Sequence, residues 1–106
     1  MAWIDACALD DVAVEDVRRF DHASHSYAIC RDAEGVVFAI DGLCTHARVH
    51  LADGLVTGRV IECPKHNGRF DIATGAPKGG PVRVPLRTYP ARVEGGRVLL
   101  ELDEAG

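Results

Sequence analysis

The sequence of 106 residues contains no long apolar run and few aromatic residues. A membrane-spanning helix needs about 18 or more consecutive apolar residues, and no segment of the chain reaches that length. The first residues (MAWID) also lack the basic and apolar stretches of a secretory signal. We therefore expect a cytoplasmic protein that has no membrane association. A chain of this length is expected to form one domain, residues 1–106.

Basic residues are in the minority, since 12 Lys+Arg stand against 16 Asp+Glu and the net charge is −4 at pH 7. Proteins that bind nucleic acids neutralise phosphates with a basic surface, so we expect no nucleic-acid partner. The charge is uneven along the chain. Residues 44–85 hold six Lys or Arg and three Asp or Glu, whereas residues 1–43 hold three and nine. The middle of the chain is therefore locally basic.

No segment keeps an apolar helical period over three turns, and no repeat or low-complexity stretch is present. Short β-type runs alternate instead with turn signals such as Asp41-Gly42, Thr74-Gly75 and Gly95-Gly96. These runs predict strands at residues 3–8, 12–14, 17–21, 26–31, 36–40, 59–63, 70–73, 88–94 and 97–102. The pattern predicts an all-β sandwich or small barrel.

Four cysteines in a cytoplasmic chain favour metal ligands or buried thiols over disulfides. Cys7 and Cys30 stand alone in apolar runs, so we expect them to be buried and inert. The other two belong to mixed motifs, Cys44-Thr45-His46 and Cys63-Pro64-Lys65-His66, and each motif follows a predicted strand. Two loops at one end of a β scaffold would thus offer four metal ligands: Cys44, His46, Cys63 and His66.

The identity of the metal follows from how the ligands are distributed. Structural zinc sites usually keep like ligands together, as Cys-x₂₋₄-Cys and His-x₃₋₅-His. A Rieske-type [2Fe–2S] centre has two Cys on one iron and two His on the other. Loops that each carry one Cys and one His fit the cluster if each loop gives one ligand to each iron. The pattern therefore favours the iron–sulfur cluster, with structural zinc as the alternative.

Several motifs around these ligands match a known family. After the first motif come GRVIECPKH at residues 58–66, Gly68-Arg69-Phe70-Asp71 and Thr74-Gly75, and then Gly80-Pro81 and Pro85-Leu86. Together they resemble the Rieske-type ferredoxins of bacterial ring-hydroxylating oxygenase systems. The resemblance extends over nearly the whole chain, and in that family a proline loop at residues 80–86 covers the cluster.

The resemblance implies a role for each ligand. Cys44 and Cys63 would bind the inner iron of one [2Fe–2S] cluster, and His46 and His66 the outer iron near solvent. The implied function is that of a one-electron shuttle that is not itself an enzyme. Its partners would be an NAD(P)H-dependent flavin reductase and a terminal oxygenase acting on aromatic compounds.

Some positions differ from related proteins, and they bear on the redox potential. Asn67 stands where many ferredoxins of the family have glycine. Rieske proteins of respiratory complexes carry a disulfide at the positions of Val49 and Lys65, and hydroxyl donors to the cluster sulfurs at those of Gly68 and Phe70. Because such hydrogen bonds stabilise the reduced cluster, their loss predicts a redox potential of about −150 mV.

Other functions remain possible for this sequence. The main alternative is the small subunit of an assimilatory NAD(P)H nitrite reductase, which has a similar fold and length. Another is a Rieske domain cut from an oxygenase, although the polar tail resembles the end of a whole protein.

We expect His50 to be a solvated loop residue. If Arg48, Lys65 and Arg69 surround the exposed histidines, a partner with an acidic recess would be attracted to this end.

Overall fold

The computed structural model describes residues 2–45 and 48–103, and residues 1, 46–47 and 104–106 lie outside the described residues. The described part of the chain forms strands and two short 3₁₀ turns, η1 (Leu9–Asp11) and η2 (Leu51–Asp53), without an α-helix. The strands are β1 (Ala2–Ala8), β2 (Asp16–His22), β3 (His25–Arg31), β4 (Val37–Asp41), β5 (Leu55–Thr57), β6 (Val60–Glu62), β7 (Arg69–Asp71), β8 (Pro77–Gly79), β9 (Thr88–Tyr89), β10 (Ala91–Glu94) and β11 (Arg97–Leu102). No helix among these residues has the length and apolar character needed to span a membrane.

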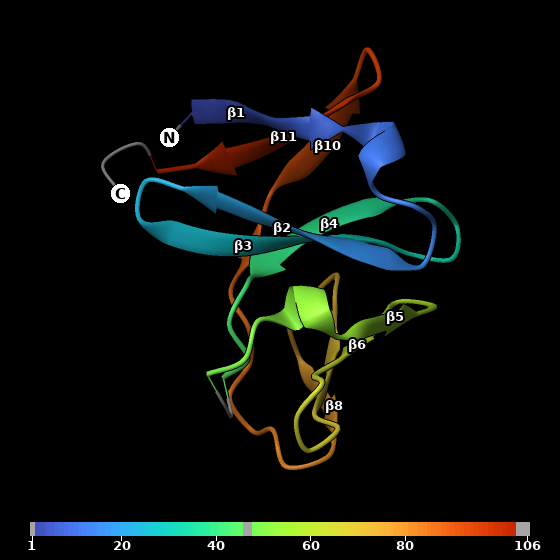
Figure 1. The fold of residues 1–106 in the computed structure, drawn as a ribbon, viewed down its shortest axis with the longest axis vertical. Helices are drawn as coiled ribbons and strands as arrows, with labels where there is room; N and C mark the ends of the chain where they lie inside the picture. Colours follow the sequence, from blue (N-terminus) through green and yellow to red (C-terminus); the bar gives the residue numbers. More distant parts are fainter. Residues whose placement is uncertain (1, 46–47, 104–106) are drawn as a thin grey trace.

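The strands form three antiparallel sheets, with orders β1-β11-β10, β2-β3-β4-β9 and β5-β6-β7-β8. Figure 1 shows the first sheet at the upper end, the second across the middle and the third at the lower end. The third sheet is built from the basic middle of the chain, residues 55–79. Both predicted ligand loops adjoin this lower sheet, so the all-β prediction and the placement of the loops at one end are confirmed.

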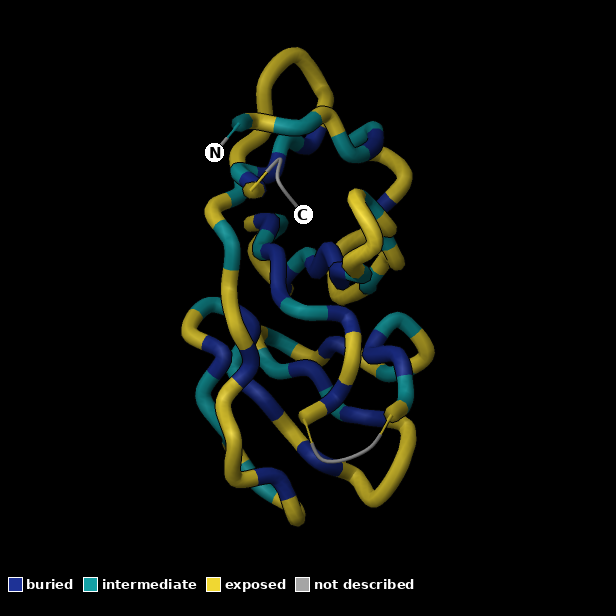
Figure 2. The backbone as a smooth tube through the Cα atoms, turned by 90° about the vertical axis from the view of Figure 1, so that its left-hand side faces the viewer, coloured by how far each residue is buried: buried dark blue, intermediate teal, exposed yellow. Residues whose placement is uncertain are grey.

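Strand β3 is buried on both faces because it lies between two apolar cores. Ala28 and Cys30 point into the core shared with the lower sheet, whereas Tyr27 and Ile29 belong to the core shared with the upper sheet. Successive side chains of a strand point to opposite faces, so an unbroken apolar run suits a strand covered on both sides. Figure 2 shows buried segments of the backbone, in dark blue, in the interior of the molecule.

A tight hairpin fixes the register of β10 and β11. Gly95 and Gly96, which join β10 to β11, have φ angles of 56° and 75°. Two successive positive φ angles are those of a type I′ turn, whose twist matches the twist of the strands. The hairpin expected from this Gly-Gly pair is therefore confirmed.

Three features differ from the strand prediction. Residues 12–14 form no strand, because the Asp11 carboxylate accepts the Ala8 N–H at 3.3 Å and the chain turns through η1. The run predicted at residues 88–94 is divided at Pro90 into β9 and β10, which belong to different sheets. Proline has no N–H to donate to a sheet, so it marks the crossing point. The short strands β5 and β8 were not predicted.

A charged link joins the middle sheet to the lower one. The buried Asp32 carboxylate accepts the backbone N–H groups of Glu34 and Val36 at 2.9 and 2.8 Å. The Arg59 guanidinium, from the β5–β6 turn, lies 3.4 Å from the same carboxylate and over the Phe38 ring, 5.4 Å from its centroid. The link fixes one end of the lower sheet relative to β4.

Gly75 and Gly58 offer a matched test of the backbone that supports the lower sheet. Both have positive φ angles, 79° and 63°. A Cβ at Gly75 would overlap the Leu86 carbonyl oxygen, whereas a Cβ at Gly58 would have no heavy atom within 4 Å. We predict that Gly58→Ala lowers the free energy of unfolding by about 1–2 kcal/mol, the cost of the left-handed conformation. Gly75→Ala should cost at least about 1 kcal/mol more, because Leu86 must also move.

Urea unfolding of the two variants and the parent chain measures these losses. Equal losses for both substitutions would contradict the close approach of Gly75 to Leu86.

Candidate metal centre

Each predicted ligand motif begins with a cysteine at the neck of a loop. The first loop follows β4, and its neck is an isolated β-bridge between Leu43 and His50. The Cys44 N–H donates across this neck to the Val49 carbonyl at 3.0 Å. In the second loop, between β6 and β7, the Cys63 N–H donates in the same way to the Gly68 carbonyl at 2.6 Å. Both loops are therefore closed by a hydrogen bond from the cysteine to the residue five positions later.

The two loops bring the two thiols together inside the protein. Cys44 is 6% exposed and Cys63 is fully buried, and both belong to the core between the middle and lower sheets. Their side chains are in hydrogen-bond contact, and burial, together with this contact, raises the pKa of the Cys63 thiol. Without a cation, the Cys63 thiol therefore resists ionisation. A buried pair of soft sulfur donors fits a ferric iron, which would stabilise both as thiolates.

His66, by contrast, lies at the surface of the second loop. Its side chain is exposed, and its backbone has a φ of 63°. A non-glycine residue in this region costs free energy and is often found at functional sites. No three His, Cys, Asp or Glu side chains of the described residues are close enough to hold a single metal ion. The structure thus separates the buried thiol pair from the exposed imidazole. His46 lies outside the described residues.

Asn67 adopts the same left-handed conformation as His66, with a φ of 56°. Glycine reaches this region without strain, and asparagine is among the residues that tolerate it best. The conformation accounts for the departure noted in the sequence, because asparagine can replace the glycine that many ferredoxins of this type have here.

A third loop, residues 80–86, packs against both ligand loops. The Thr45 hydroxyl of the first loop donates to the Val84 carbonyl at 2.8 Å. On the second loop, a Cβ at Gly80 would lie 2.7 Å from the Asn67 carbonyl oxygen, and a Cβ at Gly68 would lie 2.5 Å from Val82 Cγ1. Glycine is therefore needed at both positions for this close packing, and the proline-containing segment contacts both ligand loops.

The two positions at which respiratory Rieske proteins carry hydroxyl donors, Gly68 and Phe70, have no hydroxyl in this structure. Phe70 is fully buried, and Gly68 is buried against Val82. All four cysteines are free thiols. Neither position carries a hydroxyl that could donate to the site.

His50 is buried, and the expectation that it is solvated was wrong. Its side chain is 7% exposed. The ring Nδ1 accepts the Ala52 N–H at 3.0 Å, and Nε2 lies 2.7 Å from the Ser26 hydroxyl. Sequence reasoning missed this role because Ser26 is 24 residues away in the chain. The one local signal is the cap that His50 forms on η2.

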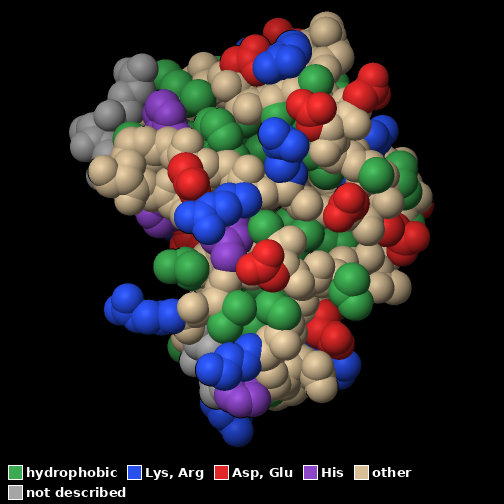
Figure 3. Space-filling view, in the orientation of Figure 1, with side chains coloured by type: hydrophobic (Ala, Val, Ile, Leu, Met, Phe, Trp, Pro, Cys, Tyr) green, Lys and Arg blue, Asp and Glu red, His purple; other side chains and the backbone are tan. Residues whose placement is uncertain are grey.

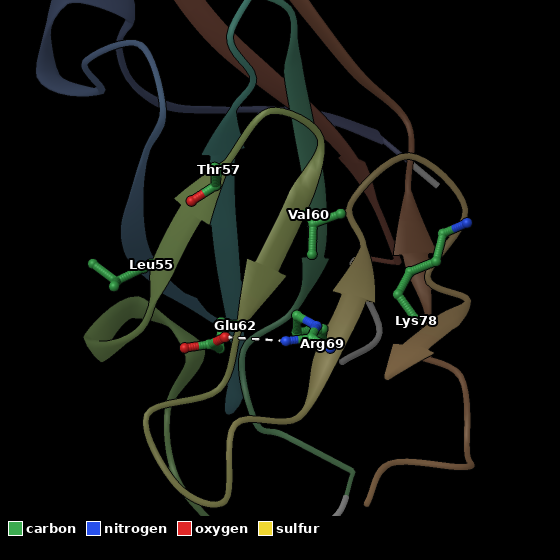
Figure 4. Close-up of a pocket in the computed structure, with 6 residues that line it drawn as sticks. All are labelled: Leu55, Thr57, Val60, Glu62, Arg69 and Lys78. Carbon is green, nitrogen blue, oxygen red and sulfur yellow. Dashed lines mark ion pairs between the residues drawn. The ribbon is translucent and has the colours of Figure 1, made fainter. Parts of the chain in front are cut away.

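The basic residues expected near the ligands divide into two groups. Arg48 and Lys65 are exposed on the two ligand loops. Arg69 instead lies on the outer face of the lower sheet, in the wall of a hollow of about 450 Å³, 3.7 Å from Glu62 (Figure 4). In Figure 3, Lys and Arg side chains and a histidine gather at the lower end of the molecule. The loop end is therefore basic even though Arg69 does not face the ligands.

Comparison with known proteins identifies the family of this fold. Residues 2–90 match the family model of the Rieske [2Fe-2S] domain. The chain belongs to this family. Rieske domains bind a [2Fe–2S] cluster through cysteine and histidine, and the structure of this chain has Cys44 on one loop and Cys63 and His66 on the other.

Similar Rieske proteins include ferredoxins of aromatic dioxygenase systems. The chain is 42% identical over 100 residues to the ferredoxin component of a naphthalene 1,2-dioxygenase system from Pseudomonas aeruginosa, covering 94% of this chain and 95% of the relative. The solved structure of a Sphingomonas yanoikuyae B1 ferredoxin superposes with a TM-score of 0.89 at 36% identity, covering 96% of this chain and all of that one. The ferredoxin in a complex of reduced oxygenase and oxidized ferredoxin of carbazole 1,9a-dioxygenase gives a TM-score of 0.87 at 32% identity, covering 92% and 100%.

The Rieske fold is also shared with more distant proteins. A putative NADH-dependent nitrite reductase small subunit from Mycobacterium tuberculosis has a TM-score of 0.82 at 24% identity, covering 93% of both chains. At this identity the likeness extends to the fold alone.

The left-handed backbone at Asn67 generates a prediction. Asn67→Gly should leave the free energy of unfolding within about 0.5 kcal/mol of the parent value, because glycine adopts the conformation freely. Asn67→Val should lower it by about 1–2 kcal/mol, because a β-branched residue is strained there. Urea titration measures both, with the exposed and extended Val93→Asn as a control for the change in residue type. A neutral Asn67→Val variant would contradict the backbone conformation of the second loop.

Proposed function

We propose that this chain is a ferredoxin that carries single electrons from an NAD(P)H-dependent flavin reductase to a terminal Rieske non-haem iron oxygenase. The observation that carries the proposal is the pair of loops that places two buried thiols behind an exposed histidine. A bound [2Fe–2S] cluster supplies reversible one-electron reduction at this position. The ferredoxin components of aromatic dioxygenase systems, similar over almost the full length of the chain, support the same role.

We propose Cys44, Cys63, His46 and His66 as the four ligands of one cluster, within a single domain of residues 1–106. The cysteines would hold the inner iron as thiolates, which favour the ferric state. The neutral imidazoles would hold the outer iron, so the added electron would lie toward the surface. This arrangement keeps the electron near the end of the molecule that a partner can approach.

The surface around the loops suits a transient partner. Leu43 and Val84 are large apolar residues exposed to 50% and 61%. Leu43 precedes Cys44, and Val84 is bonded to Thr45, so both lie beside the first ligand loop. Apolar contacts surrounded by charges such as those of Arg48 and Lys65 are typical of small interfaces that form and separate quickly.

We further propose that the chain has no catalytic activity of its own and acts in the cytoplasm. A carrier needs only an exposed redox group and a docking surface, which the loop end supplies. The four free thiols are typical of a reducing compartment. The absence of hydroxyls at Gly68 and Phe70 supports a potential at the low end of the Rieske range, about −150 mV.

The second candidate is the small subunit of an assimilatory nitrite reductase, favoured only by the shared fold. The higher identity to dioxygenase ferredoxins makes it the weaker candidate. Reduced chain mixed with a terminal aromatic oxygenase should support product formation, whereas a nitrite reductase subunit would not.

The ligand assignment predicts a coloured protein with about two irons and two acid-labile sulfides per chain. His66→Ala and Cys63→Ala should each abolish the native visible bands and the EPR signal of mixed nitrogen and sulfur ligation. The matched changes His22→Ala and Cys7→Ala, made outside the loops, should leave both signals unchanged. Visible absorption, EPR of the dithionite-reduced protein and metal analysis check these outcomes. A colourless protein containing zinc, or native bands in His66→Ala, would contradict the assignment.

The basic loop end predicts that docking depends on ionic strength. The Debye length is about 10 Å at 0.1 M salt, so added salt should slow reduction of the chain by the flavin reductase. Lys65→Gln should make this dependence shallower, whereas Arg92→Gln, at the opposite end, should not. Stopped-flow reduction at several salt concentrations measures the slopes. A rate independent of salt in the parent chain would exclude electrostatic attraction at this end.

A further inference from the structure

The neck of the first ligand loop is tied to the β2–β3 hairpin through His50. The ring Nδ1 accepts the Ala52 N–H at 3.0 Å. The proton of the neutral ring therefore lies on Nε2, which donates to the Ser26 hydroxyl at 2.7 Å. Ser26 in turn donates to the Asp21 carboxylate at 2.5 Å. In this series of three hydrogen bonds each donor has one acceptor, so all three hydrogen bonds are donated in the same direction, from Ala52 toward Asp21.

The backbone makes a parallel connection at the same place. The Gly42 N–H donates to the Ser26 carbonyl at 2.9 Å, and the Leu51 N–H donates to the Gly42 carbonyl at 2.7 Å. Position 42 has no room for a side chain, because a Cβ there would overlap His50 Nε2. Gly42 lies two residues before Cys44, so the imidazole fits directly under the start of the ligand loop.

The position of the first loop depends more on such a side-chain tie than the position of the second loop does. The second loop joins β6 to β7, which are paired along their whole length. The first loop joins β4 of the middle sheet to η2, and in the described part of the chain it is closed by the Leu43–His50 bridge with its two backbone hydrogen bonds, Cys44 N–H to Val49 and Leu51 N–H to Gly42. Without a side-chain tie, this neck would depend on few hydrogen bonds and would open more readily.

We propose that His50 is a positioning residue that holds the first ligand loop, and with it the Cys44 thiol, through the hydrogen-bonded chain Ala52–His50–Ser26–Asp21. This inference rests on the proposed function, because Cys44 needs a fixed position only if it binds the cluster. His50 would not bind the cluster itself; it would hold the Leu43–His50 bridge that closes the loop.

The surroundings keep the ring in the form that the chain requires. Burial and the nearby Arg19 lower the pKa of His50, while Asp21 and Asp53 act in the opposite direction. The net shift is downward, so the ring is neutral at pH 7 and Nδ1 remains an acceptor. Of the residues that the structure describes, His50 and Asp32 are the two whose polar or charged side chains are buried.

Two substitutions separate the two contacts of the ring. In His50→Asn, the side-chain oxygen takes the place of Nδ1 and can still accept the Ala52 N–H, but the link to Ser26 is lost. In His50→Gln, the side-chain amide takes the place of Nε2 and can still donate to Ser26, but the Ala52 acceptor is lost. His50→Leu removes both contacts, and Ser26→Ala breaks the chain from the other side. His22→Gln, on the same hairpin, is the matched control.

The first readout uses the chain without cluster. Loss of one hydrogen bond should open the neck about five times more often, so the Cys44 amide should exchange with deuterium about five times faster in His50→Asn, His50→Gln and Ser26→Ala. His50→Leu should give a larger increase, and His22→Gln none. The amide of Leu100, in the upper core, should be unchanged in all variants. Nitrogen NMR of the parent should show His50 with its proton on Nε2.

The second readout uses the cluster-loaded chain. The lifetime of the visible bands against a chelator should shorten in the order parent, single-contact variants and His50→Leu. Equal lifetimes and equal Cys44 exchange in parent and His50→Leu would overturn the positioning role. An equal increase in the amide exchange rates of Cys44 and Leu100 would also overturn the positioning role, because His50 would then support only global stability. A parent chain that never loads a cluster would instead refute the proposed function, and the exchange experiment would still decide the tie.

Discussion

The structure depends on the burial of two thiols at one place in an apolar core. Cys44 and Cys63 lie among residues such as Leu51, Ile61 and Phe70, between the middle and lower sheets. An apolar surrounding disfavours two thiolates unless a cation compensates them. The closing hydrogen bonds of the two loops and the glycines at close contacts fix the backbone on which these two cysteines lie. The packing of this half of the molecule therefore places two sulfur donors together in an apolar core.

The two ligand loops use the same closing hydrogen bond but different supports. The second loop is a hairpin tip whose shape comes from two successive left-handed residues, His66 and Asn67. The first loop has no paired strands beside it, and it is held by His50 and by contact with the 80–86 loop. One loop is thus shaped by its own backbone and the other by distant parts of the chain.

Much of the fold could be predicted from local patterns, and the exceptions have physical causes. Apolar runs between turn signals located the longer strands and the Gly95-Gly96 hairpin. Strands β5 and β8 have three residues each, and β8 contains Pro77 and Gly79, so pairing with β7 rather than propensity makes it a strand. The paired motifs identified the thiols and His66 as candidate ligands by residue type and spacing. The role of His50 could not be predicted, because its partner Ser26 is distant in sequence.

Strand β3 has a consequence for how the molecule responds to change. Ile29 and Cys30 are neighbours in the chain, yet each packs in a different core. One strand is thus a common wall for the layer that contains the thiols and for the layer that does not. We expect a change in packing volume beneath the upper sheet, such as one around Val98 or Leu100, to shift β3 and so to alter the packing around the thiols.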